Sequence, residues 1–299
     1  MGGDADATHS DARGGLMMNS TSRLSALSSR RGALRVAATV TALISLAACS
    51  PAGGGDGKAG RNGGGVKQAG DARVARNTLV VGIDVSGSFL RDGRYESSID
   101  FMANYLYAHL HGLGGLKPPT AVFVGAIGGE RPFETKSFQP IHTFQNMSVA
   151  EIAAFLRKEY PARDGLTEFN PFFDRVATLV KRQGLVLAPL NIVLLTDGLP
   201  DTPAAKGDSL GPYTKINLEK LEYLSKSVTV RVLYPEPTVA VRWERKIPRR
   251  RVRMWTVDNE VMQTWRRQYR PGVPPEEQTA LWKWIQDNVD FRVRSVGVL

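Results

Sequence analysis

The chain lacks three features that would assign it to familiar classes: a second cysteine, sequence repeats and long apolar runs. With one Cys among 299 residues, an intrachain disulfide and a cysteine-based zinc site are excluded. Without repeats or long apolar runs, a collagen, a coiled coil and a polytopic membrane protein are excluded as well. The 42% of hydrophobic residues suffice for a globular core, and the net charge of +10 makes the chain basic.

An export signal is predicted at residues 1–48. Four arginines between positions 23 and 35 overlap a short apolar stretch, Ala33–Ala48. This stretch is too short to span a bilayer comfortably, and small residues at its end suit a cleavage site. The first 16 residues carry three aspartates, which is unusual in front of a signal, so we expect translation to start at Met17 or Met18.

The segment Leu46-Ala47-Ala48-Cys49 ends the apolar stretch with the single cysteine of the chain. It resembles the lipobox of bacterial lipoproteins. The resemblance implies cleavage before Cys49, a diacylglycerol thioether on its sulfur, acylation of the new amino group and a place facing the periplasm or the cell surface. Ser50 resembles the outer-membrane sorting pattern of Gram-negative cells. An ordinary secretory signal with a chance cysteine is the alternative.

Residues 49–76 are predicted to be a lipidated cysteine followed by a tether. From Ser50 to Gly70 the sequence is polar and rich in glycine, so it cannot bury enough apolar surface to offset the entropy of ordering it. Residues 77–299 remain for the folded domain.

This domain is predicted to be a doubly wound α/β fold, with a mostly parallel sheet flanked by helices. Near-continuous apolar runs indicate strands that are buried on both faces. The predicted strands are Thr78–Ile83, Ala121–Ile127, Leu190–Thr196 and Val228–Tyr234, with Val252–Val257 as a last strand and Phe138–Phe144, which contains a proline, as an edge strand.

Helices are predicted between these strands. Ser148 and Glu151 form a capping-box pattern before one apolar-periodic stretch. Asn170 and Pro171 are expected to cap and begin the next helix, and Gly184 is expected to close it.

Polar residues follow the predicted strands at the points where ligands bind in such folds. The first strand is followed by the D-x-S-x-S pattern of Asp84, Ser86 and Ser88, and a later strand is followed by Asp197. Thr167 lies between them, just before a helix start. Each pattern alone is weak, but together they predict one cluster at one edge of the sheet.

In this order the residues resemble the metal-ion-dependent adhesion site of von Willebrand factor A domains. The resemblance covers about Asn77 to Leu299, with all five motif positions present. It implies that the serine and threonine hydroxyls bind a cation directly, that one or both aspartates act through water, and that an Asp or Glu of a partner protein completes the coordination. Hydroxyl and carboxylate oxygens suit Mg²⁺, with Mn²⁺ or Ca²⁺ as alternatives. The alternative is that the polar groups of the motif only satisfy one another and bind no ion.

The C-terminal third is basic and contains all five tryptophans, which we expect in the core. Anionic lipid or a cell-wall polymer could bind here, whereas an exported protein rarely meets nucleic acid. The alternative is a solvated basic hairpin or loop. The candidate residues for an anionic surface are Arg245, Lys246, Arg249, Arg250, Arg251 and Arg253.

Three functions follow from these patterns. The favoured one is a membrane-tethered module that binds a partner through a divalent cation and is not an enzyme. A metal-dependent hydrolase is a second hypothesis, since Asp84 resembles the nucleophile of haloacid dehalogenase-type phosphatases, but Ser86 stands where those enzymes need a second Asp. A scaffold that binds the envelope through the basic segment is the third.

Overall fold

The computed structural model describes residues 77–129, 137–163, 165–201 and 211–291. The predicted signal, Cys49 and the predicted tether lie outside the described residues. Within the described part, one sheet of six strands has the order β3-β2-β1-β4-β5-β6. The strands are β1 (Thr78–Asp84), β2 (Ala121–Ile127), β3 (Gln139–Pro140), β4 (Leu190–Leu195), β5 (Val228–Leu233) and β6 (Arg253–Val257).

Five of the strands run parallel, and β3 pairs antiparallel with β2. Every residue of β1, β2 and β5 is buried, as expected for strands covered on both faces. The predicted doubly wound α/β class is thus confirmed. From β1, the chain first adds β2 and β3 on one side. It then adds β4, β5 and β6 on the other side of β1, so the strand order switches direction between β1 and β4. We call the two ends of the parallel strands the carboxyl edge and the amino edge.

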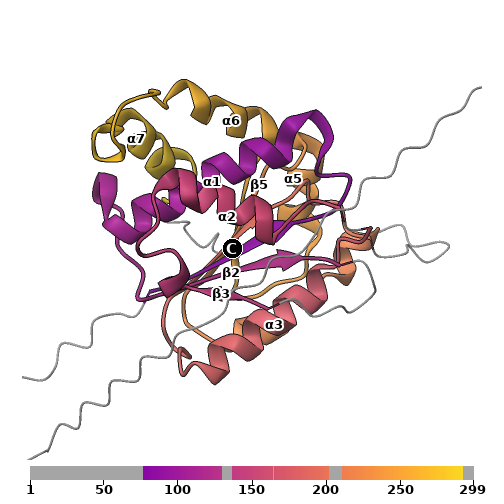
Figure 1. The fold of residues 1–299 in the computed structure, drawn as a ribbon. Helices are drawn as coiled ribbons and strands as arrows, with labels where there is room; N and C mark the ends of the chain where they lie inside the picture. Colours follow the sequence, from indigo (N-terminus) through magenta and orange to yellow (C-terminus); the bar gives the residue numbers. More distant parts are fainter. Residues whose placement is uncertain (1–76, 130–136, 164, 202–210, 292–299) are drawn as a thin grey trace, which may run out of the picture. The chain divides into compact units, whose positions relative to one another are not determined.

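Helices cover both faces of the sheet (Figure 1). Two separate hydrophobic clusters show the layers: α1, α2, α6 and α7 pack on one face, and α3, α4 and α5 on the other. No described helix combines the length and the apolarity needed to cross a bilayer. The helices are α1 (Arg94–His111), α2 (Val149–Glu159), α3 (Phe169–Arg182), α4 (Glu219–Glu222), α5 (Pro237–Lys246), α6 (Asn259–Gln263) and α7 (Thr279–Asn288), with 3-10 turns η1 (Arg91–Gly93), η2 (Leu113–Gly115), η3 (Ile141–Thr143), η4 (Pro212–Lys215), η5 (Thr264–Arg267) and η6 (Pro275–Glu277).

The local signals are confirmed except at one helix start and at the predicted edge strand. Ser148 and Glu151 form the predicted capping box of α2. Helix α3, however, begins at Phe169, so Asn170 is not its cap. The Asn170 side chain instead bonds the backbone of Lys215 and Asn217, because this amide lies against the segment that leads to α4. The predicted edge strand around Pro140 shrinks to the two residues of β3.

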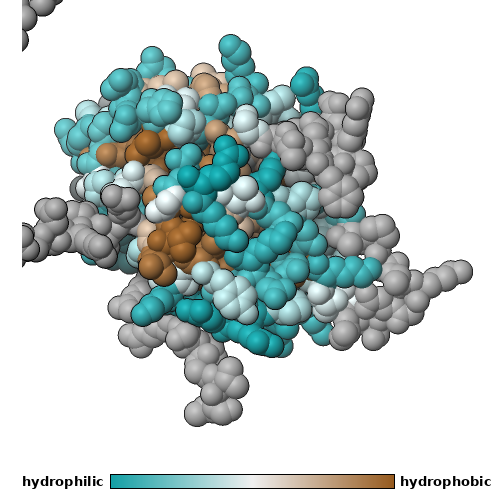
Figure 2. Space-filling model, turned by 90° about the horizontal axis from the view of Figure 1, so that it is seen from below, coloured by the Kyte–Doolittle hydropathy of each residue, from teal (hydrophilic) through white to brown (hydrophobic). Residues whose placement is uncertain are grey.

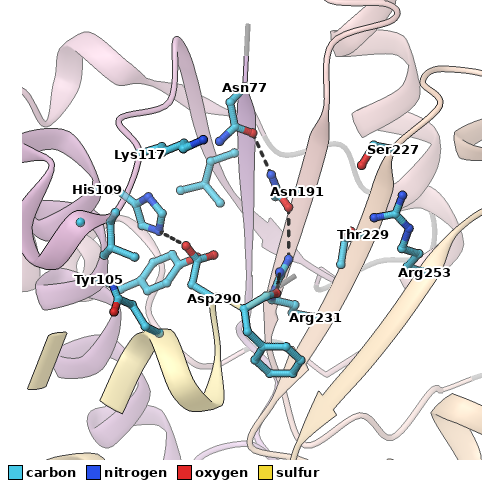
Figure 3. Close-up of a pocket in the computed structure, with 15 residues that line it drawn as sticks. Asn77, Tyr105, His109, Lys117, Asn191, Ser227, Thr229, Arg231, Arg253 and Asp290 are labelled. Atoms are coloured by element: carbon cyan, nitrogen blue, oxygen red, sulfur yellow. Dashed lines mark hydrogen bonds and ion pairs between the residues drawn. The ribbon is translucent and has the colours of Figure 1, made fainter. Parts of the chain in front are cut away.

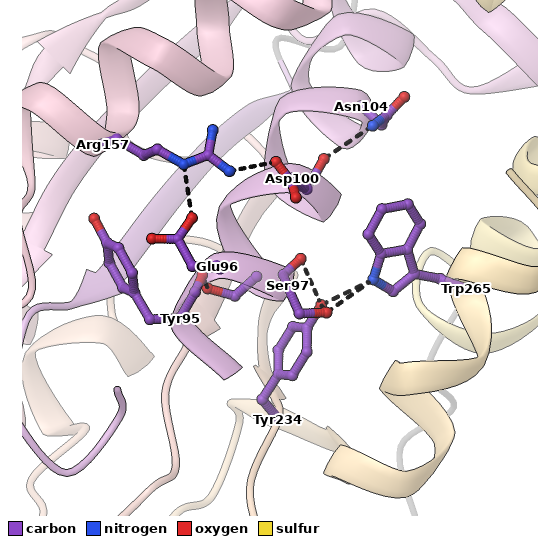
Figure 4. A network of polar contacts seen from close by, with 9 residues as sticks. Tyr95, Glu96, Ser97, Asp100, Asn104, Arg157, Tyr234 and Trp265 are labelled. Carbon is purple, nitrogen blue, oxygen red and sulfur yellow. Dashed lines mark hydrogen bonds and ion pairs between the residues drawn. The ribbon is translucent and has the colours of Figure 1, made fainter. Parts of the chain in front are cut away.

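Polar contacts tie the helices of one face together (Figure 4). Arg157 of α2 pairs with Glu96 at 2.7 Å and with Asp100 at 2.5 Å, both on α1. The hydroxyl of Tyr234, which follows β5, accepts a hydrogen bond from the indole of Trp265. Four of the five tryptophans are buried as predicted, whereas Trp255 on β6 is half-buried.

Candidate metal centre

The five predicted ligand residues meet at the carboxyl edge, on either side of the switch between β1 and β4. Asp84 is the last residue of β1, and Ser86 and Ser88 follow it in the loop. Asp197 follows the end of β4 by two residues, and Thr167 precedes α3. The oxygens of Ser86 and Ser88 lie 3.1 Å apart, and Thr167 Oγ1 lies 3.5 Å from Asp84 Oδ1.

Asp84 is the centre of this cluster and is fully buried. The backbone N–H of Ser86 donates to its Oδ1 at 2.9 Å, which closes the turn that follows β1. Thr196 Oγ1 donates to its Oδ2 at 2.5 Å and itself accepts from the N–H of Gly198 at 2.9 Å. Both carboxylate oxygens are therefore fixed in direction by the ends of two neighbouring strands.

The two buried carboxylates of the site, Asp84 and Asp197, favour a bound cation. Burial raises the pKa of Asp84 to about 7, and the charge of the nearby Asp197 adds to the rise, while hydrogen bonds from Thr196 and Ser86 oppose it. Asp197 is only 2% exposed. Among the described residues, no Lys or Arg forms an ion pair with either carboxylate. Two buried acids without a basic partner are costly, and a divalent cation would offset that cost.

The Thr167 loop reaches the site through a close backbone contact with Gly128, the residue that follows β2. Gly128 has a φ of +83°, and a Cβ built on it would lie 1.9 Å from the carbonyl oxygen of Leu166. Only glycine permits this approach. From the other side, the Asp201 carboxylate accepts the Thr167 N–H at 2.6 Å, and the Asp201 N–H donates to the Thr167 carbonyl at 3.1 Å. Thr167 is thus held between two loops.

Asp197 is oriented by a turn that packs on a buried tryptophan. Its Oδ1 accepts the N–H of Leu199 at 3.0 Å. Gly198 has a φ of +76°, and its carbonyl accepts a 2.8 Å bond from the indole of Trp243 on α5. Trp243 is fully buried. The tryptophan therefore supports the backbone next to the ligand residue.

The donor set fits a hard divalent cation. Three hydroxyls and two carboxylates supply oxygen ligands of the kind that Mg²⁺, Mn²⁺ and Ca²⁺ take. The described residues contain no cluster of three or more His, Cys, Asp or Glu suited to a metal, so a site of this kind is recognisable by its hydroxyls. Ser88 is half-exposed and Gly87 exposed, whereas the other four ligand residues are buried. The cluster is therefore open to solvent on the Ser88 side.

Sequence reasoning missed three supporting residues. Thr196 directly precedes the predicted ligand residue Asp197, and this position is the signal that could have identified Thr196. Asp201 is not among the predicted ligand residues, but its carboxylate accepts the Thr167 backbone N–H. Trp243 lies 46 residues beyond Asp197, and no local pattern links the two.

The candidate anionic-surface residues do not join this site. Arg245 and Lys246 end α5, and Arg253 begins β6. Because the strands are parallel, the segment between α5 and β6 lies at the amino edge, away from the metal centre. The alternative of a solvated basic hairpin or loop is thus wrong for Arg245 and Lys246, the first part of the basic segment. These two residues are helical because Pro237 starts a helix that has Trp243 on its buried face.

Comparison with known proteins gives likeness in fold. No family model and no curated protein sequence matches the chain. Among solved structures, a von Willebrand factor type A protein from Catenulispora acidiphila is 13% identical over 69% of this chain, with a TM-score of 0.41, and the chain spans 43% of its length.

Two further solved structures similar to this chain carry metals. Manganese-loaded TRAP protein from Plasmodium vivax is 14% identical over 62% of this chain and 70% of its own, with a TM-score of 0.39. Proximal thread matrix protein 1 from the mussel byssus, with a zinc-occupied adhesion-site motif, is 12% identical over 70% of this chain and 46% of its own, with a TM-score of 0.38. Of these three structures, the one from Catenulispora acidiphila is described as von Willebrand factor type A.

Proposed function

We propose that the domain is a binding module that holds a divalent cation, Mg²⁺ in particular, and grips an acidic side chain of a protein partner through it. The observation that carries the proposal is the pair of buried carboxylates, Asp84 and Asp197, which three hydroxyls surround and no described basic residue neutralises.

The proposed binding depends on the charge of the ligand residues, because three of the five are neutral. Ser86, Ser88 and Thr167 present neutral oxygens, so the positive charge of a bound cation would be only partly compensated. A cation in this site supplies an open coordination position that favours a carboxylate from outside. The half-exposed Ser88 marks the side from which such a carboxylate can approach.

A binding role agrees better with the geometry than a hydrolytic one does. A nucleophilic aspartate needs an accessible oxygen, but Asp84 is fully buried and both its oxygens already accept hydrogen bonds. Asp197 is similarly buried, and its Oδ1 is engaged by the Leu199 N–H. Their burial and hydrogen bonds support the proposal that these two carboxylates hold a cation rather than attack a substrate.

We further propose that Cys49 anchors the domain to a bacterial membrane, facing the periplasm or the cell surface. The support is the Leu46–Cys49 sequence and the glycine-rich stretch after it. Replacing Cys49 by Ser should release the protein from the membrane fraction. Persistent membrane association of that variant would contradict the anchor.

Affinity capture from envelope extracts tests the metal-bridged function. The full chain and its Asp84→Ala variant are compared in Mg²⁺ and in EDTA. We expect a partner that is retained by the wild type in Mg²⁺ and lost in the other three conditions. Asp92→Ala is the matched control, because Asp92 follows Ser88 by four positions in the chain, has a carboxylate that is 75% exposed and is not one of the five ligand residues. Equal retention in all conditions would overturn the proposal.

A further inference from the structure

The amino edge gathers segments that are far apart in sequence. Since β1, β4, β5 and β6 are parallel, the residues that precede them lie at the same edge. These are Asn77 and the segments 183–189, 223–227 and 247–252. Direct contacts confirm the gathering: the Leu187 N–H donates to the Leu224 carbonyl at 2.7 Å, and the Thr78 N–H to the Pro189 carbonyl at 2.9 Å.

Large apolar side chains are exposed at this edge. Leu187 is 75% exposed and Tyr223 is 69% exposed, the two highest values among the exposed large hydrophobic residues, and Val186 next to Leu187 is also exposed. The face of the domain seen from the α3 side has brown apolar surface among teal hydrophilic residues (Figure 2), and the exposed fractions above identify the apolar residues of the amino edge. Exposed apolar residues that lie together mark a surface that binds something.

The backbone of Leu187 is strained. Its φ is +76°, a conformation that glycine or asparagine adopts at lower cost. Burial does not compensate the strain, since most of the side chain is in solvent. The conformation of Leu187 therefore lowers the stability of the fold while its side chain stays exposed. Backbone strain of this kind clusters at functional positions.

Positive charge surrounds these apolar residues. Lys226, Arg250 and Arg251 are exposed, and none forms an ion pair with a described residue. Two carboxylates, the exposed Glu219 and the buried Glu222, line a pocket with Arg250, and Glu222 accepts the backbone N–H of Arg250 at 2.5 Å without forming an ion pair with its guanidinium. Tyr223 and Arg250 line one shared pocket of about 460 Å³, which joins the apolar and basic parts.

A second pocket, of about 660 Å³, opens at the same edge and is also rich in cations (Figure 3). Lys117, Arg231 and Arg253 line it, and Asp290 is the one carboxylate among the described lining residues. In this pocket Asn191 links the side chains of Asn77 and Arg231. The positive character of the edge therefore extends beyond the exposed arginines.

We propose that the amino edge is a docking surface for an anionic lipid bilayer. Leu187 and Val186 enter the boundary between head groups and acyl chains, Tyr223 lies at the head groups, and Lys226, Arg250 and Arg251 contact lipid phosphates. Burial of the leucine and attraction of the basic residues to an anionic surface act in the same direction and favour reversible docking.

A bilayer fits this edge better than a protein partner because of where the chain enters. Asn77 lies at the amino edge, 28 positions after Cys49 in the sequence. This preference for a bilayer rests on the proposed lipid anchor: with 27 residues between Cys49 and Asn77, a lipid on Cys49 would keep this edge within reach of the membrane. Docking would then direct the metal centre, at the opposite edge, away from the bilayer and toward partners.

The single cysteine of the chain makes the orientation measurable. In the full chain with Cys49→Ser, a new cysteine at Leu187→Cys or, as a control, Leu90→Cys carries a polarity-sensitive fluorophore. Leu90 is 47% exposed at the carboxyl edge. With phosphatidylglycerol-containing vesicles, we expect a blue shift and quenching by bilayer-embedded quenchers at position 187 and none at 90. No response at 187, an equal response at both positions, or an equal response to pure phosphatidylcholine would overturn the proposal.

The variant Leu187→Asn separates docking from folding. Asparagine tolerates a φ of +76°, so the melting temperature should stay equal or rise. Binding to the anionic vesicles, measured by co-sedimentation, should fall about tenfold, while Leu90→Asn should leave it unchanged. A concentration-dependent fluorophore response without vesicles would instead assign the surface to a second copy of the chain. None of these readouts depends on the cation, so they can fail or succeed independently of the proposed metal function.

Discussion

The two edges of one sheet are built in opposite ways. At the carboxyl edge, polar side chains are buried, and hydrogen bonds between them fix nearly every oxygen, as at Asp84. At the amino edge, apolar side chains are exposed, and basic residues such as Arg250 extend without ion partners in the described part of the chain. Each edge thus contradicts the usual rule of an apolar interior and a polar surface.

The difference shows how a parallel sheet separates two kinds of binding. Residues that follow the strands meet at one edge, and residues that precede them meet at the other. A cation site needs rigid, desolvated oxygens, whereas contact with a lipid surface needs accessible apolar and cationic groups. Neither set of residues can serve the other purpose, and the strands hold the two sets apart.

The largest expected effect comes from the close backbone approach at the carboxyl edge. Gly128→Ala would place a Cβ 1.9 Å from the Leu166 carbonyl oxygen at a φ of +83°. We expect a loss of about 3 kcal/mol or more in the free energy of unfolding, because overpacking and a disfavoured φ add together. Gly165→Ala, in the partner loop, meets nothing within 4 Å and should cost about 0.5 kcal/mol at most. Denaturant unfolding of both variants measures the difference; equal stabilities would refute the close contact.

The next largest effect is that of the cation itself. Mg²⁺ at a hundred times its dissociation constant should stabilise the domain by about 2.7 kcal/mol, and Asp84→Asn should abolish the gain. Burial and the neighbouring Asp197 raise the pKa of Asp84 to about 7, so the metal-free domain is most stable with Asp84 protonated and loses that stability as pH rises from about 4 through 7.

The cation binds the carboxylate, so protons compete with it. The rise in melting temperature on adding Mg²⁺ should therefore be larger at pH 8 than at pH 5.5, as thermal scans at both values can show. A pH-independent rise, or an equal rise in Asp84→Asn, would count against an Asp84-centred site.

The smallest effect compares one substitution at both edges. Thr196→Val removes the hydroxyl that bonds Asp84 and Gly198, and should cost about 1–3 kcal/mol. Thr78→Val, at the start of β1, removes a buried hydroxyl without a hydrogen-bond partner among the described residues, and should be neutral or stabilising. Chemical denaturation of the pair reports both values. If Thr78→Val were destabilised and Thr196→Val were neutral, the hydrogen bonding assigned to these two hydroxyls would be contradicted.

Much of the fold follows from local patterns. The buried strands are visible as apolar runs, and the capping box at Ser148 marks the start of α2 because its two hydrogen bonds are local. The start of α3 was misplaced because the Asn170 amide found long-range partners on Lys215 and Asn217. A competing tertiary contact of this kind leaves no trace in the local sequence.

By itself, the sequence determined the doubly wound α/β class and the five oxygen-bearing residues, because residue type and strand ends are local properties. The tertiary structure alone decided that Asp201 and Trp243 support Thr167 and the Gly198 turn, and that Leu187, Tyr223 and Arg250 share one edge. Those contacts join residues up to 45 positions apart, and only the parallel pairing of strands, with its crossover helices, brings them together.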